Sequence, residues 1–381
     1  MTLMSDLDQK KISEIATVVS GTSPKGGDIN DAGLGVPFYQ GSKEFGSLHP
    51  RPERFTEHPV KTALAGDILI SVRAPVGRIN IADTDCAIGR GVMAVRPKNP
   101  ADQTYLAAVL GAMGAEWDSH ASDGTMFSNL SKPGLENMKI DWPEDRGLIG
   151  ELLDALTGKI EANRQLVDSI GRLIVDECHL AFERREGQDE ISLVEAVRLV
   201  NGGAFTKDAS QTGRMVIRIK ELNSGPSEST IYNSISVPPE KTSYPGDVLF
   251  AWSGSLGVWR WYQDEAIINQ HIFKVLPKAH PVWLGWVHIL NSLVGFQDIA
   301  AGKATTMGHI TKDHLTRARV PKLSAAELDA LTANVEPLWD YQVRIGQEMH
   351  SLIELREFVI PRLLVGDLQV ASVEKDLEEA R

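Results

Sequence analysis

GDILISVRAPVGRINIADTDCAIGRGVMAVRPK (66–98) and GDVLFAWSGSLGVWRWYQDEAIINQHIFKVLPK (246–278) are two versions of one pattern in the same chain. They have the same length, begin with Gly-Asp and end with Pro-Lys. In the first version Ile68, Ile70 and Val72 alternate with other residues after a turn-forming Gly-Asp pair, which is typical of a strand. A Gly-containing turn and a second strand follow, and Pro97 ends that strand. The chain therefore contains one strand-rich pattern twice.

The repeat extends beyond these stretches. ISEIATVVSG (12–21) corresponds to LVEAVRLVNG (193–202), and GTMFSNLSKPGLENMKI (124–140) corresponds to ATTMGHITKDHLTRARV (304–320). A repeat of this period indicates two copies of a whole α+β domain. In the two copies we expect opening helices near 13–19 and 193–200, and further helices near 105–115 and 283–293.

A long segment with seven-residue apolar spacing follows each copy. One row contains Leu331, Leu338, Ile345, Leu352 and Val359, with Leu328, Val335, Met349 and Leu363 as its companion row. In the first segment the rows are Leu153, Ile160, Val167, Ile174 and Ala181, and Ile149, Leu156, Asn163 and Ile170. Such a stripe requires a partner helix, and each helix is the obvious partner of the other. The predicted seam residues are Leu156, Ile160, Asn163, Val167, Ile170, Leu338, Ile345 and Leu352. Each helix could instead pack only on its own globular domain.

The acidic charge is concentrated in these two segments. The net charge of the chain is −12, and the segments 144–190 and 324–381 contribute −6 and −7. The remainder carries +1, so the overall acidity does not exclude nucleic acid as a ligand of the globular parts. With only Cys86 and Cys178, we expect two inert thiols in a reducing cytoplasm. No transmembrane helix or secretory signal is expected.

Two long antiparallel helices would hold the two globular domains apart with approximate two-fold symmetry. This arrangement suits a linear ligand that is read at two places, as dimeric proteins read DNA.

The ordered set of motifs, repeated twice around heptad helices, resembles the specificity subunits of type I restriction–modification systems. The motifs are the Gly-Asp strand, the small-residue turns SGTSPK (20–25) and NGGAFTK (201–207), and the late Ser131-Lys132 and Thr311-Lys312 elements. The resemblance covers about residues 11–366. The turn RAPVGR (73–78) departs from it, because the family more often has a small turn such as SGSLG (253–257).

The resemblance implies an α+β fold in which two long antiparallel coiled-coil helices separate two target recognition domains, each with a mixed sheet and short helices. The expected parts are a first recognition domain at 1–146, a spacer helix at 147–187, a second recognition domain at 188–322, a spacer helix at 323–366 and a charged, disordered tail at 367–381.

The resemblance also implies a function. Each recognition domain would read one half of a bipartite DNA target, and the helices would set the spacer between the halves. The chain would recruit two modification (methyltransferase) subunits and restriction (translocase and endonuclease) subunits in the cytoplasm. S-adenosylmethionine, ATP and Mg would act on those partners. Because the two copies share framework residues but not loop residues, the target should be asymmetric.

The sequence contains no constellation that predicts catalysis or metal binding. It lacks a phosphate-binding Gly-rich loop, a dinucleotide-binding loop and a metal-ligand spacing. Asp67 and Asp247 are better explained as turn-forming residues. Trp259 and Trp261 are better explained as core residues than as base-stacking residues.

Side chains that bind bases or phosphates are expected on loops of the two domains. The candidates in the first domain are Thr22, Ser23, Lys25, Gln40, Ser42, Lys43, Arg73, Arg78, Arg90, Thr125, Ser128 and Asn129. Those in the second are Thr206, Lys207, Arg218, Lys220, Ser253, Ser255, Arg260, Asn269, Gln270, His271, Lys303, Thr305, Thr306, His309 and Lys312.

Two other functions remain open at this level. The chain could be a non-catalytic coiled-coil scaffold that binds proteins and no DNA. It could also be a one-chain nuclease or methyltransferase, although no residues support that chemistry.

Overall fold

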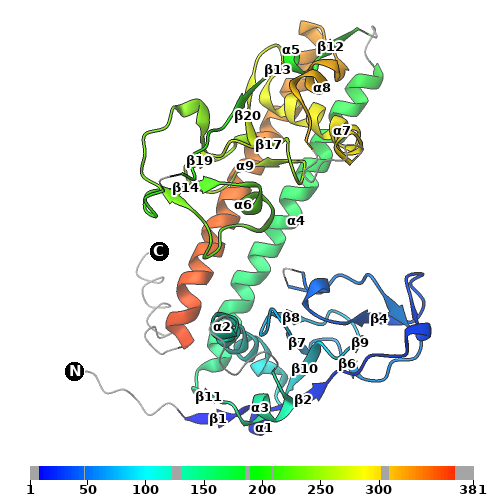
Figure 1. The fold of residues 1–381 in the computed structure, drawn as a ribbon, viewed down its shortest axis with the longest axis vertical. Coiled ribbons are helices and arrows are strands. Elements are labelled where there is room, and N and C mark those ends of the chain that lie inside the picture. The colour runs from blue at the N-terminus through cyan, green and yellow to red at the C-terminus, as the bar shows by residue number, and fades with distance from the viewer. Residues whose placement is uncertain are drawn as a thin grey trace. The chain divides into compact units, whose positions relative to one another are not determined.

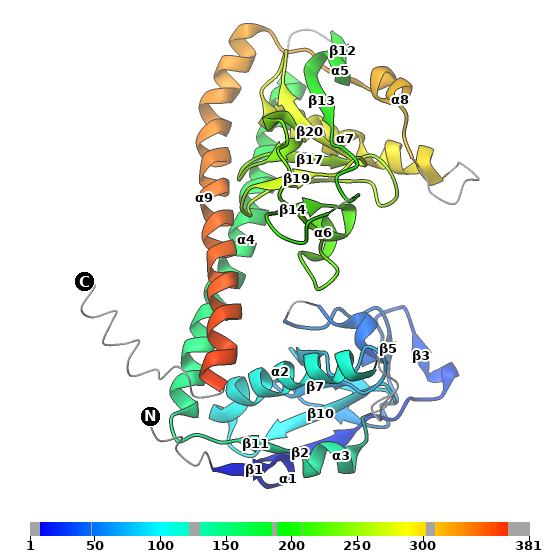
Figure 2. The same cartoon turned by 60° about the vertical axis from the view of Figure 1, so that its left-hand side comes forward.

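The structure is a computed structural model, and it describes residues 8–46, 48–121, 130–184, 189–207, 209–301 and 309–364. The chain divides into two compact units. Unit 1 comprises Met1–Gly158 and Glu354–Arg381, and unit 2 comprises Lys159–Ile353. Each unit has its own sheets, core and helical parts, which are drawn in Figures 1 and 2.

Unit 1 contains three sheets. Its strands are β1 (Gln9–Lys11), β2 (Ala16–Ser20), β3 (Ile29–Asn30), β4 (Val36–Tyr39), β5 (Phe55–Thr56), β6 (Thr62–Ala63), β7 (Ile68–Ser71), β8 (Ile79–Ile81), β9 (Cys86–Ile88), β10 (Val92–Pro97) and β11 (Lys139–Asp141). The strand orders are β2-β10-β7-β8, β3-β5-β4-β9-β6 and β1-β11. The second sheet is mixed, because β4 and β9 run parallel.

Unit 2 repeats this plan. Its strands are β12 (Glu190–Ser192), β13 (Val197–Asn201), β14 (Arg214–Ile217), β15 (Tyr232–Asn233), β16 (Thr242–Ser243), β17 (Val248–Ala251), β18 (Gly257–Arg260), β19 (Ala266–Ile268), β20 (Ile272–Pro277) and β21 (Arg319–Pro321). The orders β13-β20-β17-β18, β15-β14-β19-β16 and β12-β21 match those of unit 1, except that the additional strand β3 of unit 1 has no counterpart among the described strands of unit 2. Val95 and Val275 occupy the same register, facing Ile68 and Val248. The internal repeat seen in the sequence is therefore a repeat of topology.

The helices follow the same order in both copies, except that the second copy has the helix α6 where the first has the 3-10 helix η2. They are α1 (Ile12–Ile15), α2 (Gln103–Ala121), α3 (Lys132–Asn137), α4 (Arg146–Arg184), α5 (Leu193–Ala196), α6 (Ile219–Ser224), α7 (Val282–Ala301), α8 (Lys312–Arg317) and α9 (Ala325–Leu364). Short 3-10 helices are η1 (Gly26–Asp28), η2 (Ser42–Glu44), η3 (Pro100–Asp102) and η4 (Pro239–Lys241). The prediction of two very long helices is confirmed by α4, with 39 residues, and α9, with 40.

The helices expected near 13–19 and 193–200 are corrected. Each is a single turn, α1 or α5, that passes directly into a strand, β2 or β13. Val18, Val19, Leu199 and Val200 pair with β10 or β20 in these strands. The β-branched valines favour this extended pairing, and tertiary contact overrides the helical spacing.

Helix α2 packs on the β2-β10-β7-β8 sheet of unit 1, and helix α7 packs on the β13-β20-β17-β18 sheet of unit 2. In unit 1 the core contains Ile68, Ile70, Leu106 and Leu110, all 0% exposed. In unit 2 the sheet and α7 share one core with α4 and α9, where Ile174 and Val335 are both 0% exposed. The long helices are therefore integral parts of the core.

The seam residues of unit 2 lie between α4 and α9. Ile160, Asn163, Val167, Ile170 and Ile345 are buried. Leu156 of unit 1 and Leu338 and Leu352 of unit 2 are half-buried. The Asn163 amide donates a 3.0 Å hydrogen bond to Glu348 across the helix pair.

The repeated Gly-Asp pairs form the turns before β7 and β17. Gly66 and Gly246 have φ of 87° and 95°, a region that favours glycine. Each aspartate closes its turn by accepting a backbone hydrogen bond, Asp67 from Leu64 N at 2.8 Å and Asp247 from Tyr244 N at 2.7 Å. Their turn-forming role is confirmed.

Candidate nucleic-acid interface

In unit 1, several polar loops meet at one end of the four-stranded sheet, where β2 and β7 end and β10 begins. Gly21 N donates to Val92 O at 3.0 Å, and Thr22 N donates to Ile88 O at 2.9 Å. Val72 N donates to Gly91 O at 3.0 Å. These bonds bring Thr22, Ser23, Gln40, Arg73 and Arg90 of the predicted set into one loop cluster. We call it the unit 1 loop cluster.

In unit 2, the corresponding backbone hydrogen bonds occur at the same places. Gly202 N donates to Ile272 O at 3.0 Å, and Gly203 N donates to Ile268 O at 3.1 Å. Trp252 N donates to His271 O at 3.3 Å. The unit 2 loop cluster formed in this way contains Ser253, Asn269, Gln270, His271 and His309, of which Ser253 and His309 form a β-bridge.

A glycine permits the close approach in each cluster. A Cβ atom on Gly21 would lie 2.2 Å from Gly89 O, and one on Gly202 would lie 2.2 Å from Asn269 O. Real Cβ atoms do not approach carbonyl oxygens this closely, and backbone cannot move aside as a flexible side chain can. The small-residue turns of the two copies therefore have a physical reason.

Two predicted base readers, at corresponding positions after β4 and β14, are occupied by internal contacts. The Gln40 amide donates to Ser23 Oγ at 3.1 Å. Arg218 donates to the buried carboxylate of Glu221 through both Nε and Nη2, and to Ser229 O at 2.7 Å. The hydrogen bonds that Arg218 donates to Glu221 raise the pKa of its guanidinium. Arg218 thus supports the start of α6, and Lys220 donates to the nearby Ser229 hydroxyl.

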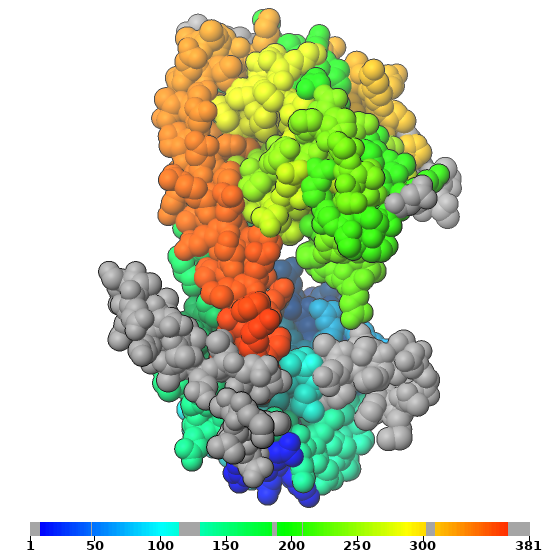
Figure 3. All heavy atoms as spheres, turned by 90° about the vertical axis from the view of Figure 1, so that its left-hand side faces the viewer, coloured from blue at the N-terminus to red at the C-terminus, as the bar shows by residue number. Residues whose placement is uncertain are grey.

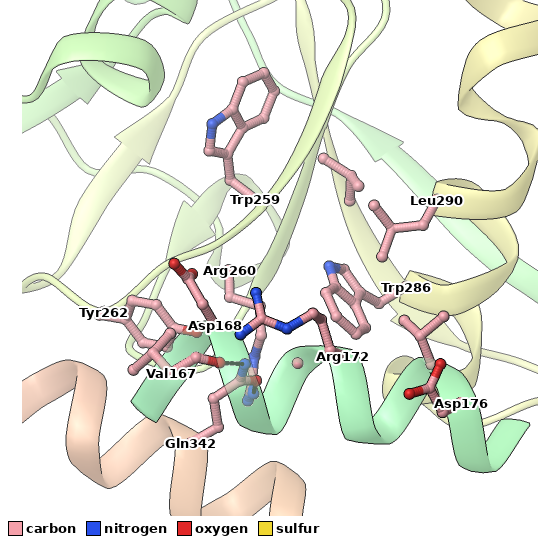
Figure 4. A pocket seen from close by; sticks show the side chains of 13 residues that line it. Val167, Asp168, Arg172, Asp176, Trp259, Arg260, Tyr262, Trp286, Leu290 and Gln342 are labelled. Atoms are coloured by element: carbon pink, nitrogen blue, oxygen red, sulfur yellow. Dashed lines mark hydrogen bonds between the residues drawn. The ribbon is translucent and has the colours of Figure 1, made fainter. Parts of the chain in front are cut away.

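The expectation for Arg260 is corrected. Its side chain is only 9% exposed and projects from β18 to α9, where it donates to Trp339 O at 3.2 Å and to Gln342. Burial lowers its pKa to about 10. Figure 4 shows Arg260 and Gln342 beside a cavity of about 550 Å³ whose lining includes Trp259 and Trp286. Arg260 therefore connects the sheet to the helix pair and does not lie on a loop surface.

The remaining candidates differ in exposure. Ser253 and Asn269 are buried, at 6% and 8% exposure, so they form part of the framework of the loops. Lys43 pairs with Glu53 at 2.9 Å. The other exposed candidates are Thr22, Lys25, Arg73, Arg78, Arg90, Lys207, Ser255, Gln270 and Lys312, and the half-exposed ones are Ser23, Ser42, Thr206, His271 and His309.

Some predictions lie outside the described residues. These are the candidates Thr125, Ser128, Asn129, Lys303, Thr305 and Thr306, and the tail 367–381.

Two residues that the sequence reasoning missed belong to the unit 2 loop cluster. Trp252 Nε1 donates to Asn201 Oδ1 at 2.9 Å, and the Trp252 ring lies 5.5 Å from the His271 ring. A residue-by-residue comparison of the two sequence copies could have identified both residues, because Asn201 and Trp252 stand where the first copy has Ser20 and Val72. Trp261 is 3% exposed and Trp259 packs on the same apolar cluster, which confirms their core role.

Both cysteines of the chain are buried. Burial raises the pKa of the Cys86 and Cys178 thiols to about 12, so both remain protonated near neutral pH. Within the described ranges, no three His, Cys, Asp or Glu side chains are grouped so that they could hold a metal ion. No helix of the described part is long and apolar enough to cross a membrane.

The chain is similar to known specificity subunits. Residues 4–172 match the family model described as the type I restriction modification DNA specificity domain. The MjaX type I restriction enzyme specificity subunit of Methanocaldococcus jannaschii is 36% identical over 156 residues, which are 40% of this chain and 36% of that protein. The MjaIX specificity subunit of the same organism is 22% identical over 97% of this chain and 95% of its own length.

A solved structure shares the fold along nearly the whole chain. It is a type I restriction–modification S subunit from M. genitalium, with 13% identity and a TM-score of 0.58, and the match covers 96% of this chain and 98% of that one. The repeated units, the two long helices and these sequence matches agree: residues 4–172 match the type I specificity domain, and the chain is similar to type I restriction–modification specificity subunits in sequence and fold.

Proposed function

We propose that this chain is the DNA-sequence-recognition subunit of a type I restriction–modification complex. The domains at 1–146 and 188–322 each read one half of a bipartite, asymmetric target. The single observation that carries this proposal is the pair of loop clusters, because the same backbone framework presents different exposed side chains in the two units. The helices at 147–187 and 323–366 set the spacer between the half-sites.

The chain performs no chemistry in this proposal. Modification subunits supply methyl transfer from S-adenosylmethionine, and restriction subunits supply ATP- and Mg-dependent translocation and cleavage, all in the cytoplasm. What supports this division is the similarity of the chain to specificity subunits and the inert character of its two thiols.

The long helices offer a surface for these partners. Leu166, Leu173 and Leu180 are spaced by seven residues on α4 and are 36%, 45% and 43% exposed. Tyr341 on α9 is 42% exposed, and Figure 3 shows the α9 residues of unit 2, in orange, on the outer surface. A heptad row of exposed leucines favours a further helix as its partner. We assign this row to the modification subunits, two for each chain.

Leu173→Lys should abolish co-purification with the modification subunit, because it places a charge in the proposed apolar contact. Leu34→Lys is the matched control, since Leu34 is 56% exposed on a loop of unit 1. Native mass spectrometry of the wild-type complex should show two modification subunits. A single copy, or equal retention by both variants, contradicts the assignment.

Methylation mapping tests the function itself. A host that carries this chain with its modification subunit should acquire methylated adenines within one bipartite sequence. The purified complex should also bind DNA with a steep dependence on salt, because phosphate contacts release counterions. Protein binding without any DNA binding would favour the scaffold alternative.

A further inference from the structure

One exposed position corresponds in the two loop clusters, and in both it carries a side chain of a type that can read base edges. The turn 89–91 connects β9 to β10, and the turn 269–271 connects β19 to β20. Val92 N donates to Gly89 O at 3.0 Å, and Ile272 N donates to Asn269 O at 3.2 Å, so the same bond closes both turns. Arg90 and Gln270 occupy the same place in these turns.

The neighbours of Arg90 and Gln270 are held by the framework. Gly89 N donates to Tyr39 O at 2.8 Å, and Asn269 N donates to Ile217 O at 3.1 Å. The third residue of each turn accepts a hydrogen bond from the residue that directly follows β7 or β17: Gly91 O accepts from Val72 N, and His271 O accepts from Trp252 N. The middle residue therefore projects from a turn whose backbone is fixed on both sides, while its side chain is exposed.

Two other corresponding pairs of candidates in the clusters differ from this one. Gln40 and Arg218 are only half-exposed, and they donate to Ser23 and Glu221. Arg73 is exposed, but its counterpart Ser253 is 6% exposed. By contrast, the Arg90 guanidinium has no hydrogen bond or ion pair to another described residue. It remains available for a ligand.

The side chain of Gln270 is oriented by its neighbour. Its amide nitrogen lies 3.3 Å from His271 Nε2. The His271 ring lies in turn 5.5 Å from Trp252, whose indole N–H is bonded to Asn201. A glutamine amide held at an exposed turn presents one donor and one acceptor side by side.

We propose that Arg90 and Gln270 are the base-specifying residues of their units, Arg90 for a guanine in one half-site and Gln270 for an adenine in the other. An arginine fork matches the two acceptors on the major-groove edge of guanine, and a glutamine amide matches the acceptor and donor of adenine. The inference rests on the proposed function and adds the position and base class to it.

Four variants of the full chain, each assembled with its modification subunit, test this inference. They are Arg90→Ala, Arg90→Lys, Gln270→Ala and the control Arg51→Gln, which alters an exposed arginine outside the loop clusters. Each purified complex selects from duplexes with randomised half-sites, and methylation mapping in the host gives a second measure. Selection reports base preference even where methylation is weak.

Arg90→Ala should lose its guanine preference at one position of one half-site, by about 5- to 150-fold, and Gln270→Ala should lose an adenine preference in the other half. Arg90→Lys should retain guanine, because lysine also donates to its acceptors. Arg51→Gln should match the wild type.

Unchanged base preference with uniformly weaker binding would overturn the inference, since it would make the residue a phosphate contact. A change in both half-sites would also overturn it. A wild-type complex with no sequence preference would instead contradict the proposed function.

Discussion

His280 and His288 form a buried pair in unit 2. His280 Nδ1 lies 3.0 Å from His288 Nε2, and the side chains are 4% and 1% exposed. The ring of Phe182 on α4 stacks on His288 at 5.7 Å. Burial lowers the pKa of both histidines, and that of His288 to about 3. Burial therefore favours the neutral form of both rings in the folded chain.

This pair predicts that the folded state becomes less stable in mild acid. Below a pH of about 6.5, His288 binds a proton in the unfolded chain, whereas in the folded chain it stays neutral until the pH approaches its lowered pKa. The folded state is therefore most stable above a pH of about 6.5, and its free energy of unfolding decreases as the pH is lowered. Between pH 7.5 and 5.0, His288 alone should reduce the free energy of unfolding by about 2 kcal/mol. Urea denaturation at the two pH values measures the loss.

His288→Gln should flatten this pH dependence. The exposed His58 provides the control, and His58→Gln should leave the dependence as it is. An unaltered dependence in His288→Gln would assign the acid sensitivity to other groups.

At the scale of elements, one buried polar contact joins the β13-β20-β17-β18 sheet of unit 2 to the helix pair. Gln342 is 3% exposed, donates to Val167 O on α4 at 2.7 Å and accepts from Arg260 on β18. Three elements therefore share one amide group. Because Arg260 is buried and positively charged, it depends on these acceptors and on the Trp339 ring, whose centre is 3.2 Å away.

Gln342→Leu should destabilise unit 2 by about 2–3 kcal/mol, because it removes the amide that a buried guanidinium and a helix carbonyl share, and leaves Trp339 O as the remaining acceptor of the guanidinium. Gln347→Leu, on the exposed side of α9, should change stability by less than about 0.5 kcal/mol. Chemical denaturation measures both. Adding Arg260→Met to Gln342→Leu should recover part of the loss, since apolar side chains can replace a buried charged contact. A larger loss in the double variant would contradict this account.

The elements also show how far the sequence could predict the fold. The heptad rows predicted α4 and α9, because a long stripe of apolar residues is a local signal. The companion row passes through position 342, where the sequence gives no reason for glutamine. The reason is Arg260, a tertiary contact from a distant strand. The sequence analysis likewise extended α1 and α5 too far, because the strands that follow these single turns form only by pairing with β10 and β20.

The candidate interface was predictable where local sequence signals determine it. The small-residue turns and the Gly-Asp pairs are local signals, and they located the loops that form the two clusters. The partners of Arg260 depend on long-range packing, whereas Arg218 has a local partner, Glu221, three residues later. The list of polar loop residues took neither kind of partner into account, so it included both arginines. Comparing the two copies residue by residue separates Arg90 and Gln270 from such side chains.

At the scale of the whole molecule, the helices that join the two units are proposed to act as a spacer. A four-residue insertion lengthens a helix by about 6 Å and turns its distal part by about 40°. DNA rises about 3.4 Å for each base pair. Insertions after Asn163 and at the facing level near Glu348 should therefore lengthen the unread gap by about one or two base pairs, with unchanged half-sites. Methylation mapping measures the gap. Retained methylation with the original gap would show that the helices do not set it.

The central claim is that each unit reads its own half of the target. Exchanging residues 12–140 for the corresponding residues of another specificity subunit tests this claim most directly. Strand β1 and the long helices α4 and α9 lie outside this range and remain those of this chain. The measurement is the methylated sequence in a host that carries the exchanged chain with its modification subunit. The account predicts that one half-site changes to that of the donor, while the other half-site keeps its sequence. A change in both half-sites, or in neither while methylation persists, would contradict it.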